Sequence, residues 1–324
     1  MGRCGKAVRI VENWPSTAKT QKAQRIQPGH GRSIFAALRW RSLRRCGGKD
    51  VVQYFSHNGL TIAYRTFGHG PVPVIGFHGY GGSTNDFAPF ATPLADRCTI
   101  HAFDIWFNGA SSWPIDRKVS DPLRPEELTD LVRAYMDENG IQRALYAGFS
   151  LGGRLAMSLM ESLPDRSRGM LLLAPDGLVR NPWYRWLSRY GWGRALYKSF
   201  QDKPEGWFRT VDALHRVKLV TAKRHSFLRF HTENKDKRQL VHDVWLSLRL
   251  LEPNLNTVVR NLREQDLHAH LYMGRFDSVI KLPWGQRFQR RAPERIHLTV
   301  LETGHQVRTA GLMAMLAAHP ALWK

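Results

Sequence analysis

Apolar residues alternate with polar ones on both sides of Asn58-Gly59. The alternating apolar positions are Val52, Tyr54, Leu60, Ile62 and Tyr64. An Asn-Gly pair between two alternating runs is typical of a tight hairpin turn. Residues 51–67 are therefore predicted to form a β-hairpin.

From Val72 onward, short apolar runs alternate with helical stretches. Residues 72–77 are almost continuously apolar and predict a buried strand. Pro125 and the acidic residues after it open a helix that Asn139-Gly140 closes. Such alternation implies parallel strands joined by right-handed crossovers. We predict an α/β fold with a mostly parallel twisted sheet and flanking helices, built from residues 51–177 and 266–324.

The pattern changes between residues 178 and 265, where helical stretches and aromatic residues replace the strand signals. We predict an inserted helical cap there. Its first part, residues 182–200, interleaves aromatic residues such as Trp183 with arginines. The aromatic residues either pack over a pocket while the arginines point to water, or form an interfacial surface on anionic lipid.

Gly148-Phe149-Ser150-Leu151-Gly152 has the spacing G-x-S-x-G, with an apolar run before it and an amphipathic helix after it. A strand-to-helix turn of this kind exposes a serine hydroxyl, and the glycines relieve the crowding of the turn. Ser150 is therefore the candidate nucleophile, and the backbone N–H of Leu151 is a candidate donor to an oxyanion.

The strand at residues 72–77 ends in His78-Gly79-Tyr80. A turn with several glycines can direct backbone N–H groups into a site, and we assign the second oxyanion donor to the N–H of Tyr80. His78 is interpreted as a residue that stabilises this turn and transfers no proton.

Two aspartates follow strand signals late in the chain. Asp277 comes after the turn at Gly274, and Asp176 comes after an earlier strand. An aspartate beyond a strand end can orient a histidine, and the order serine, acid, histidine favours Asp277. A helix-capping role for Asp277 is the alternative.

Of the 14 histidines, His305 alone lies in a Gly-His turn after the final strand, and it is the candidate base.

These motifs together resemble the α/β-hydrolase superfamily, and within it the capped esterase, C–C hydrolase and lipase-like branch. The resemblance runs from about Val51 to the C-terminus. It also includes Asp104, Asn108, Gly109 and Ser111, which look like an aspartate-glycine-serine loop of the family. It implies a catalytic triad of Ser150, Asp277 and His305, with no metal or organic cofactor.

The loop after Asp104 departs from the family pattern, because many relatives carry a proline and glycines at the positions of Ile105 to Asn108. We therefore expect a bulky aromatic pocket wall, with substrate-binding roles for Trp106, Phe149 and Trp183. A serine at position 150 argues against dehalogenases and epoxide hydrolases of this fold, which use an aspartate there.

The charge is concentrated in two segments of the 324-residue chain. Residues 1–50 carry 12 Lys or Arg against 2 acids, and residues 178–265 carry 18 against 8, so these segments hold +20 of the net +21. Residues 1–50 lack sustained periodicity and are predicted to be a mostly disordered basic tail, a targeting segment or a misassigned start. Positive charge that is confined to two segments indicates a surface that faces an anionic partner. A uniformly basic chain would instead indicate general affinity for nucleic acids.

No run of residues is long and apolar enough to span a bilayer, and the three cysteines show no metal or redox spacing. We expect a cytoplasmic protein, peripheral at the membrane surface, that acts as a serine hydrolase on an ester or related acyl bond of a hydrophobic substrate. The alternatives are a C–C bond hydrolase or thioesterase with the same triad, and a non-catalytic binding protein of the same fold.

Overall fold

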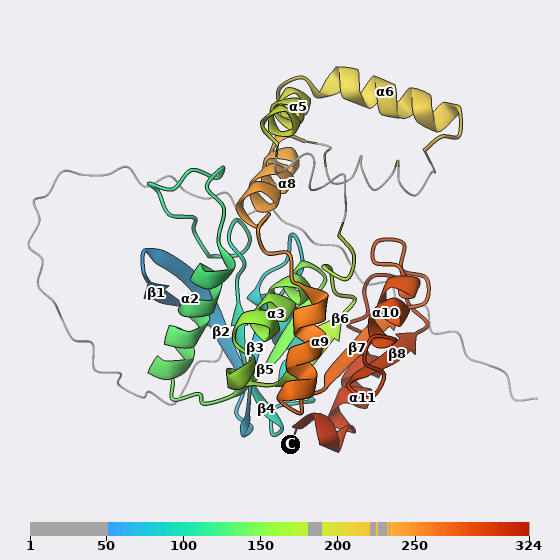
Figure 1. Ribbon diagram of the computed structural model, residues 1–324. Helices are drawn as coiled ribbons and strands as arrows, with labels where there is room; N and C mark the ends of the chain where they lie inside the picture. The colour runs from blue at the N-terminus through green and yellow to red at the C-terminus, as the bar shows by residue number, and fades with distance from the viewer. Residues whose placement is uncertain (1–50, 181–189, 221–224, 226–231, 233, 324) are drawn as a thin grey trace, which may run out of the picture. The chain divides into compact units, whose positions relative to one another are not determined.

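The computed structural model describes residues 51–180, 190–220, 225, 232 and 234–323 (Figure 1). All of them belong to one unit of the chain, Gly47–Lys324. The predicted basic tail at residues 1–50 and the substrate-binding candidate Trp183 lie outside the described residues.

An eight-stranded sheet forms the centre of the described structure, in the order β1-β2-β4-β3-β5-β6-β7-β8. The strands β1 and β2 pair antiparallel with each other, β2 pairs antiparallel with β4, and all other neighbours are parallel. The bounds are β1 Gln53–His57, β2 Leu60–Gly68, β3 Val72–Phe77, β4 Cys98–Phe103, β5 Ala144–Phe149, β6 Ser167–Leu173, β7 Ala269–Gly274 and β8 Ile296–Leu301.

The predicted hairpin is present between β1 and β2, where His57 pairs with Leu60. Asn58 and Gly59 both take a positive φ, 48° and 78°, which is the backbone that an Asn-Gly turn adopts at little cost. The sequence prediction of an α/β fold with a mostly parallel sheet is confirmed.

Helices pack on both faces of the sheet. Five of the described helices contribute to one apolar core: α2 Pro125–Glu138, α3 Leu151–Ser162, α8 Lys235–Ser247 (through Val244), α9 Leu255–Glu264 and α10 Leu282–Gln289. On the other face, the 3-10 turn η1 Thr84–Phe87 and the helices α1 Ala88–Ala91 and α11 Ala310–Ala317 contribute to a second core. Short 3-10 turns, η2 Pro164–Arg166 and η3 Pro320–Trp323, complete the elements around the sheet.

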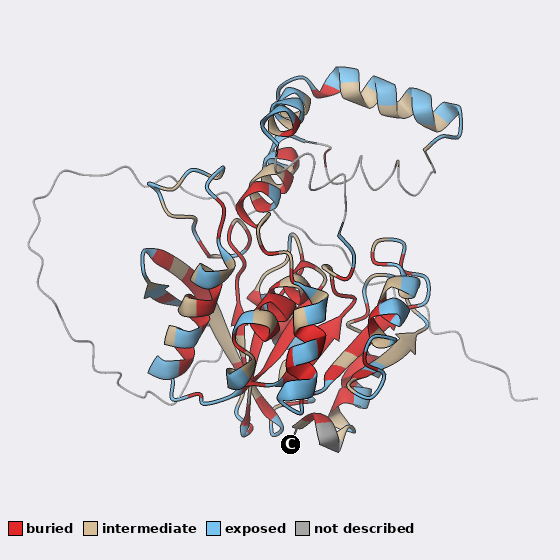
Figure 2. Cartoon of the chain, viewed as in Figure 1, coloured by how far each residue is buried: buried red, intermediate tan, exposed pale blue. Residues whose placement is uncertain are grey.

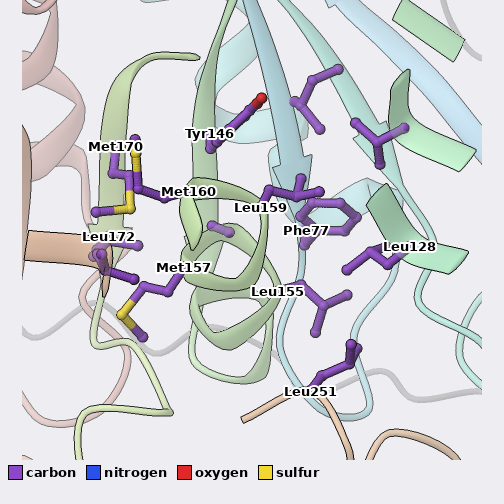
Figure 3. Packing of buried hydrophobic residues seen from close by; sticks show 14 of the residues in the cluster. Phe77, Leu128, Tyr146, Leu155, Met157, Leu159, Met160, Met170, Leu172 and Leu251 are labelled. Carbon is purple, nitrogen blue, oxygen red and sulfur yellow. The ribbon is translucent and has the colours of Figure 1, made fainter. Parts of the chain in front are cut away.

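The helix α3 is the centre of the first core (Figure 3). Leu155, Leu159 and Met160 have no exposed surface, and Figure 3 places them among side chains of β3, β5, β6 and α2. The residue Gly153 lets the first turn of the helix approach the segment after β6, because a Cβ there would lie 2.4 Å from the Cβ of Pro175. The position of Ser150, directly before α3, is therefore fixed by core packing.

Between β6 and α9, the residues that the structure describes form the helices α5 Gly191–Asp202, α6 Pro204–Arg216 and α8 Lys235–Ser247. Most residues of α6 are exposed or only partly buried (Figure 2). The predicted range 178–265 also contains α9, but the Asn261 side chain donates hydrogen bonds to the Met160 and Glu161 carbonyl oxygens at 2.9 and 3.0 Å. The helix α9 therefore belongs to the layer on the sheet, and the described helices left for the predicted cap are α5, α6 and α8, of which α8 also places Val244 in the first core.

Replacement of Leu159 by alanine should destabilise the protein by about 2–5 kcal/mol, because it leaves a cavity in a close-packed core. The change is measured by urea unfolding. Met315 on α11 is 43% exposed, so Met315→Ala should change the free energy of unfolding by less than about 0.5 kcal/mol. If the two substitutions changed the free energy of unfolding equally, this description of the core would be contradicted.

Candidate active site

Ser150 occupies a strained turn between β5 and α3. Its φ is 51° and its ψ is −116°, a conformation that a residue with a side chain rarely adopts. A Cβ at position 148 would lie 2.2 Å from the Gly152 carbonyl oxygen, and one at position 152 would lie 2.0 Å from that of Phe77. Both glycines are therefore required by the close approach of the backbone, and the turn projects the serine side chain away from the sheet.

A chain of hydrogen bonds links Ser150 to two residues far away in the sequence. The Nε2 atom of His305 lies 3.0 Å from the Ser150 Oγ, and its Nδ1 lies 2.8 Å from Asp277 Oδ2. A carboxylate only accepts, so Nδ1 carries the proton and Nε2 is the acceptor for the serine hydroxyl. The three residues that the sequence assigns to the triad lie together in the structure.

The loops that carry Asp277 and His305 are bound to each other. The backbone N–H groups of Arg275 and Phe276 donate to the carbonyl oxygens of Leu301 and Thr303 at 2.8 and 3.0 Å. A Cβ at Gly274 would lie 2.1 Å from the Gly304 carbonyl oxygen, so glycine is needed where the loops cross. This crossing sets the separation between the carboxylate and the imidazole.

The Asp277 carboxylate contacts both the histidine and the backbone of its own turn, and it is not the cap of the helix that follows, because the N-cap of α10 is Lys281. One carboxylate oxygen, Oδ2, contacts the histidine, while Oδ1 accepts hydrogen bonds from the backbone N–H groups of Val279 and Ile280 at 2.7 and 2.9 Å. The side chain is fully buried. The local turn therefore holds the carboxylate in the orientation that contacts the imidazole.

The rival acid, Asp176, has other partners. Its carboxylate forms an ion pair with Arg154 on α3 and accepts a hydrogen bond from the Gly177 N–H at 2.7 Å. Only its backbone approaches the serine, by donating to the Ser150 carbonyl oxygen at 2.8 Å. The structure thus pairs His305 with Asp277.

His78 lies fully buried at the end of β3, and both of its ring nitrogens are occupied. Its Nδ1 donates to the Gly79 carbonyl oxygen at 2.6 Å, and its Nε2 accepts from the Ile105 N–H at 2.9 Å. Burial lowers the pKa of this imidazole, so the ring is neutral. These contacts agree with the interpretation of His78 as a residue that stabilises the turn.

The loop after β3 passes directly against the serine turn. A Cβ at Gly79 would lie 2.8 Å from the Phe149 ring and 3.3 Å from the Ser150 Cβ. Tyr80 is the next residue along this loop, and Leu151 is the first residue of α3. The two predicted oxyanion donors therefore lie on segments that meet at Ser150.

The loop after β4 holds the Tyr80 loop in place. Asn108 accepts a hydrogen bond from the Gly81 N–H at 2.9 Å, and Asp104 accepts one from the Thr84 N–H at 2.6 Å. Both residues lie in the loop whose sequence resembles the aspartate-glycine-serine loop of the family. Their hydrogen bonds define the role of both residues, which is to tie two loops together.

Two of the predicted substrate-binding residues lie in the described structure, and Trp106 is not supported in that role. Its indole is fully buried and donates to the Thr61 carbonyl oxygen at 3.0 Å, so it has no exposed face for a ligand. The prediction is corrected because Trp106 turns into the core. Phe149 is 5% exposed, and its ring centroid lies 5.2 Å from that of His305, so its ring packs against the imidazole. Its substrate-binding role stays a prediction.

Within the described part of the chain, no group of three or more His, Cys, Asp or Glu residues could hold a metal ion. Among the same residues, no helix combines the length and the apolar character needed to cross a bilayer.

A sequence profile described as alpha/beta hydrolase fold matches residues 72–292, which is more than half of the chain. The chain belongs to this family. The matched range includes Ser150 and Asp277 and ends before His305, so the assignment of the base depends on the geometry.

Among curated proteins, one relative is the dihydrolipoyllysine-residue acetyltransferase component of the acetoin cleaving system of Cupriavidus necator. This α/β-hydrolase is 32% identical to it over 125 residues, which cover 39% of this chain and 32% of the relative. It is 31% identical over 110 residues to a (lyso)-N-acylphosphatidylethanolamine lipase of Bos taurus, covering 34% and 32%. The chain thus spans about a third of the length of these relatives.

The fold is shared with a solved carboxylesterase structure from Nitrososphaera gargenis, with a TM-score of 0.57 at 17% identity. The match covers 84% of this chain and 98% of that one. At this identity the likeness establishes the fold and leaves the substrate to be argued from the site.

If the chain is the serine hydrolase expected from its sequence, replacement of Asp277 by asparagine should lower kcat for ester hydrolysis by on the order of 10⁴-fold, because an amide would stabilise the wrong imidazole tautomer. The matched variant Asp176→Asn should have a far smaller effect, since that carboxylate contacts Arg154. Steady-state kinetics with a p-nitrophenyl ester measure both. The pairing of His305 with Asp277 would be overturned if Asp176→Asn lowered kcat severely and Asp277→Asn lowered it only slightly.

Proposed function

We propose that this α/β-hydrolase is a serine hydrolase that cleaves a carboxylic ester or a related acyl bond of a hydrophobic substrate. The observation that carries the proposal is the hydrogen-bond chain from the Ser150 hydroxyl through His305 to the buried Asp277 carboxylate. Nucleophile, base and orienting acid each lie at hydrogen-bond distance from the next, as nucleophilic catalysis by serine requires.

In the proposed reaction, the Ser150 Oγ attacks the substrate carbonyl carbon while His305 Nε2 takes its proton. Asp277 keeps the imidazole oriented and stabilises its positive charge. His305 then gives the proton to the leaving group, which departs as the acyl-enzyme forms. Water, deprotonated by His305, attacks the acyl carbon and releases the acid and the free serine.

The tetrahedral intermediate carries a negative oxygen that needs donors close by. We assign this role to the N–H groups of Leu151, at the start of α3, and of Tyr80. A helix N-terminus favours negative charge, which supports the choice of Leu151. The loss of one such donor typically costs about 10²–10³ in kcat.

Aromatic side chains of the insertion support a hydrophobic substrate. Tyr197 and Phe200 on α5 are in contact with each other, at a centroid distance of 5.9 Å, and Tyr197 also contacts Trp245 on α8 at 6.1 Å. Burial raises the pKa of Tyr197, which interacts electrostatically with Tyr80 of the proposed oxyanion loop. An aromatic group near this loop favours an apolar acyl chain over a strongly polar substrate.

The alternatives use the same fold. A thioesterase or a C–C bond hydrolase can share the triad, and graded ester, thioester and ketone substrates would separate them. A non-catalytic binding protein would retain the fold without a reactive serine. The complete hydrogen-bond chain at Ser150 favours an enzyme over such a protein.

Replacement of Ser150 by alanine should lower turnover by on the order of 10⁴-fold or more while the protein stays folded. Labelling by a fluorophosphonate probe, located by mass spectrometry, should disappear together with esterase activity. The control variant Ser162→Ala removes the last serine of α3 and should keep both the labelling and the esterase activity. Near-normal ester hydrolysis by Ser150→Ala would exclude the serine mechanism.

We also propose that the protein binds to membrane surfaces that contain anionic lipid. Large apolar side chains are exposed around α5 and α6, including Trp192 at 55%, Val217 at 63% and Leu219 at 72%. Exposed basic residues lie on the same two helices or directly beside them: Lys198, Lys203, Arg209, Arg216 and Lys218. Apolar groups interleaved with cations fit an interface with anionic headgroups.

Vesicles that contain anionic lipid should co-sediment with the protein, and neutral vesicles should not, because each Lys or Arg near an anionic surface contributes about 1 kcal/mol. Trp192→Ala should weaken this binding several-fold. The control Tyr54→Ala replaces a residue of β1 that is 60% exposed and should leave it unchanged. The proposal would be overturned if the protein bound both vesicle types equally or bound neither. It would also be overturned if the protein bound DNA and not the anionic vesicles.

A further inference from the structure

Arg308 lies three residues after His305 and contacts two other segments of the site. Its Nη1 atom forms an ion pair with Asp86 Oδ2 at 2.8 Å, and its guanidinium carbon lies 4.2 Å from the centroid of the Phe149 ring. The side chain is only 17% exposed. No local sequence motif marks an arginine in this loop as part of a site.

The Phe149 ring is enclosed by groups of the site. It lies 5.2 Å from the His305 ring, it lies in the space that a Cβ at Gly79 would need, and the Arg308 guanidinium covers it. A ring held in this way forms a fixed wall behind the imidazole. Phe149 therefore packs against the imidazole that Asp277 orients.

Asp86 connects the same arginine to the oxyanion loop. A Cβ at Gly82 would lie 2.3 Å from Asp86 Oδ2, and the Gly82 N–H donates to the Gly79 carbonyl oxygen at 3.1 Å. The carboxylate thus packs against the turn that contains Tyr80. Through Asp86, the arginine is coupled to the loop that carries the second proposed oxyanion donor.

We propose that Arg308 is a positioning residue that binds together the histidine loop, the serine turn and the oxyanion loop. The proposal rests on the serine hydrolase function proposed above. A planar guanidinium suits this role because its face lies on an aromatic ring while its edge donates to a carboxylate. Its Nη2 also donates to Gln306 Oε1 at 2.9 Å, which fixes the plane within the loop.

Replacement of Arg308 by alanine should lower kcat about 10–100-fold, since a displacement of about 1 Å in a reacting group costs rates of this order. The KM should stay within about twofold, because Arg308 is not proposed to touch substrate. Labelling of Ser150 by a fluorophosphonate should slow by the same factor as kcat. Arg308→Lys keeps the charge without the planar face, so its kcat should lie between those of the wild type and Arg308→Ala.

A double-mutant cycle separates positioning from loss of stability. Asp86→Asn should also lower kcat, and the double variant Asp86→Asn/Arg308→Ala should be no slower than Arg308→Ala. Arg166 is the matched control, because its side chain is 19% exposed and paired with Asp137 at 2.8 Å away from the site. Arg166→Ala should leave kcat per folded molecule unchanged.

Three results would overturn the role of Arg308. The first is an Arg308→Ala enzyme whose activity falls only in proportion to its folded fraction. The second is a rise in KM with unchanged kcat, which would make the arginine a substrate-binding residue. The third is additive losses in the cycle with Asp86. A wild-type protein that neither labels nor hydrolyses esters would instead refute the proposed function, so the two failures are distinguishable.

Discussion

The arrangement of this site depends on the contact between the backbone at the start of α3 and the ends of β3 and β5. Gly152 lies so close to the Phe77 carbonyl oxygen that a Cβ would be 2.0 Å from it. This crossing forces Ser150 into its positive φ and brings the Tyr80 loop against the serine turn. The buried leucines of α3 hold the helix in this position, so packing in the core maintains the strain at the surface.

Much of the fold and of the candidate site could be predicted from local patterns. The Asn58-Gly59 turn and the runs of apolar residues identify the hairpin and the parallel strands. Ser150, Asp277 and His305 could be found because each follows a strand, and the carboxyl ends of parallel strands meet at one edge of a sheet. The order of the motifs along the chain then favoured Asp277 over Asp176, and the structure pairs Asp277 with the histidine.

Side-chain direction within loops could not be predicted in this way. A strand alternates its side chains between two faces, but no period applies to the loop at Trp106, where Phe107 has a φ of 68°. The indole therefore turns into the core although its neighbours suggested a pocket wall. Arg308 was missed for a related reason, because its partners, Asp86 and Phe149, are brought to it by tertiary structure alone.

The position of β8 has a consequence for how the protein loses activity. This strand is the last of the sheet and pairs only with β7, yet the loop after it carries His305. Edge elements open at a lower free energy than the centre of a sheet, so β8 can detach while the core around α3 stays folded. The imidazole would then leave Ser150 in a molecule that is otherwise native. For the proposed serine hydrolase, heating should therefore abolish activity at a lower temperature than the one at which the whole protein unfolds.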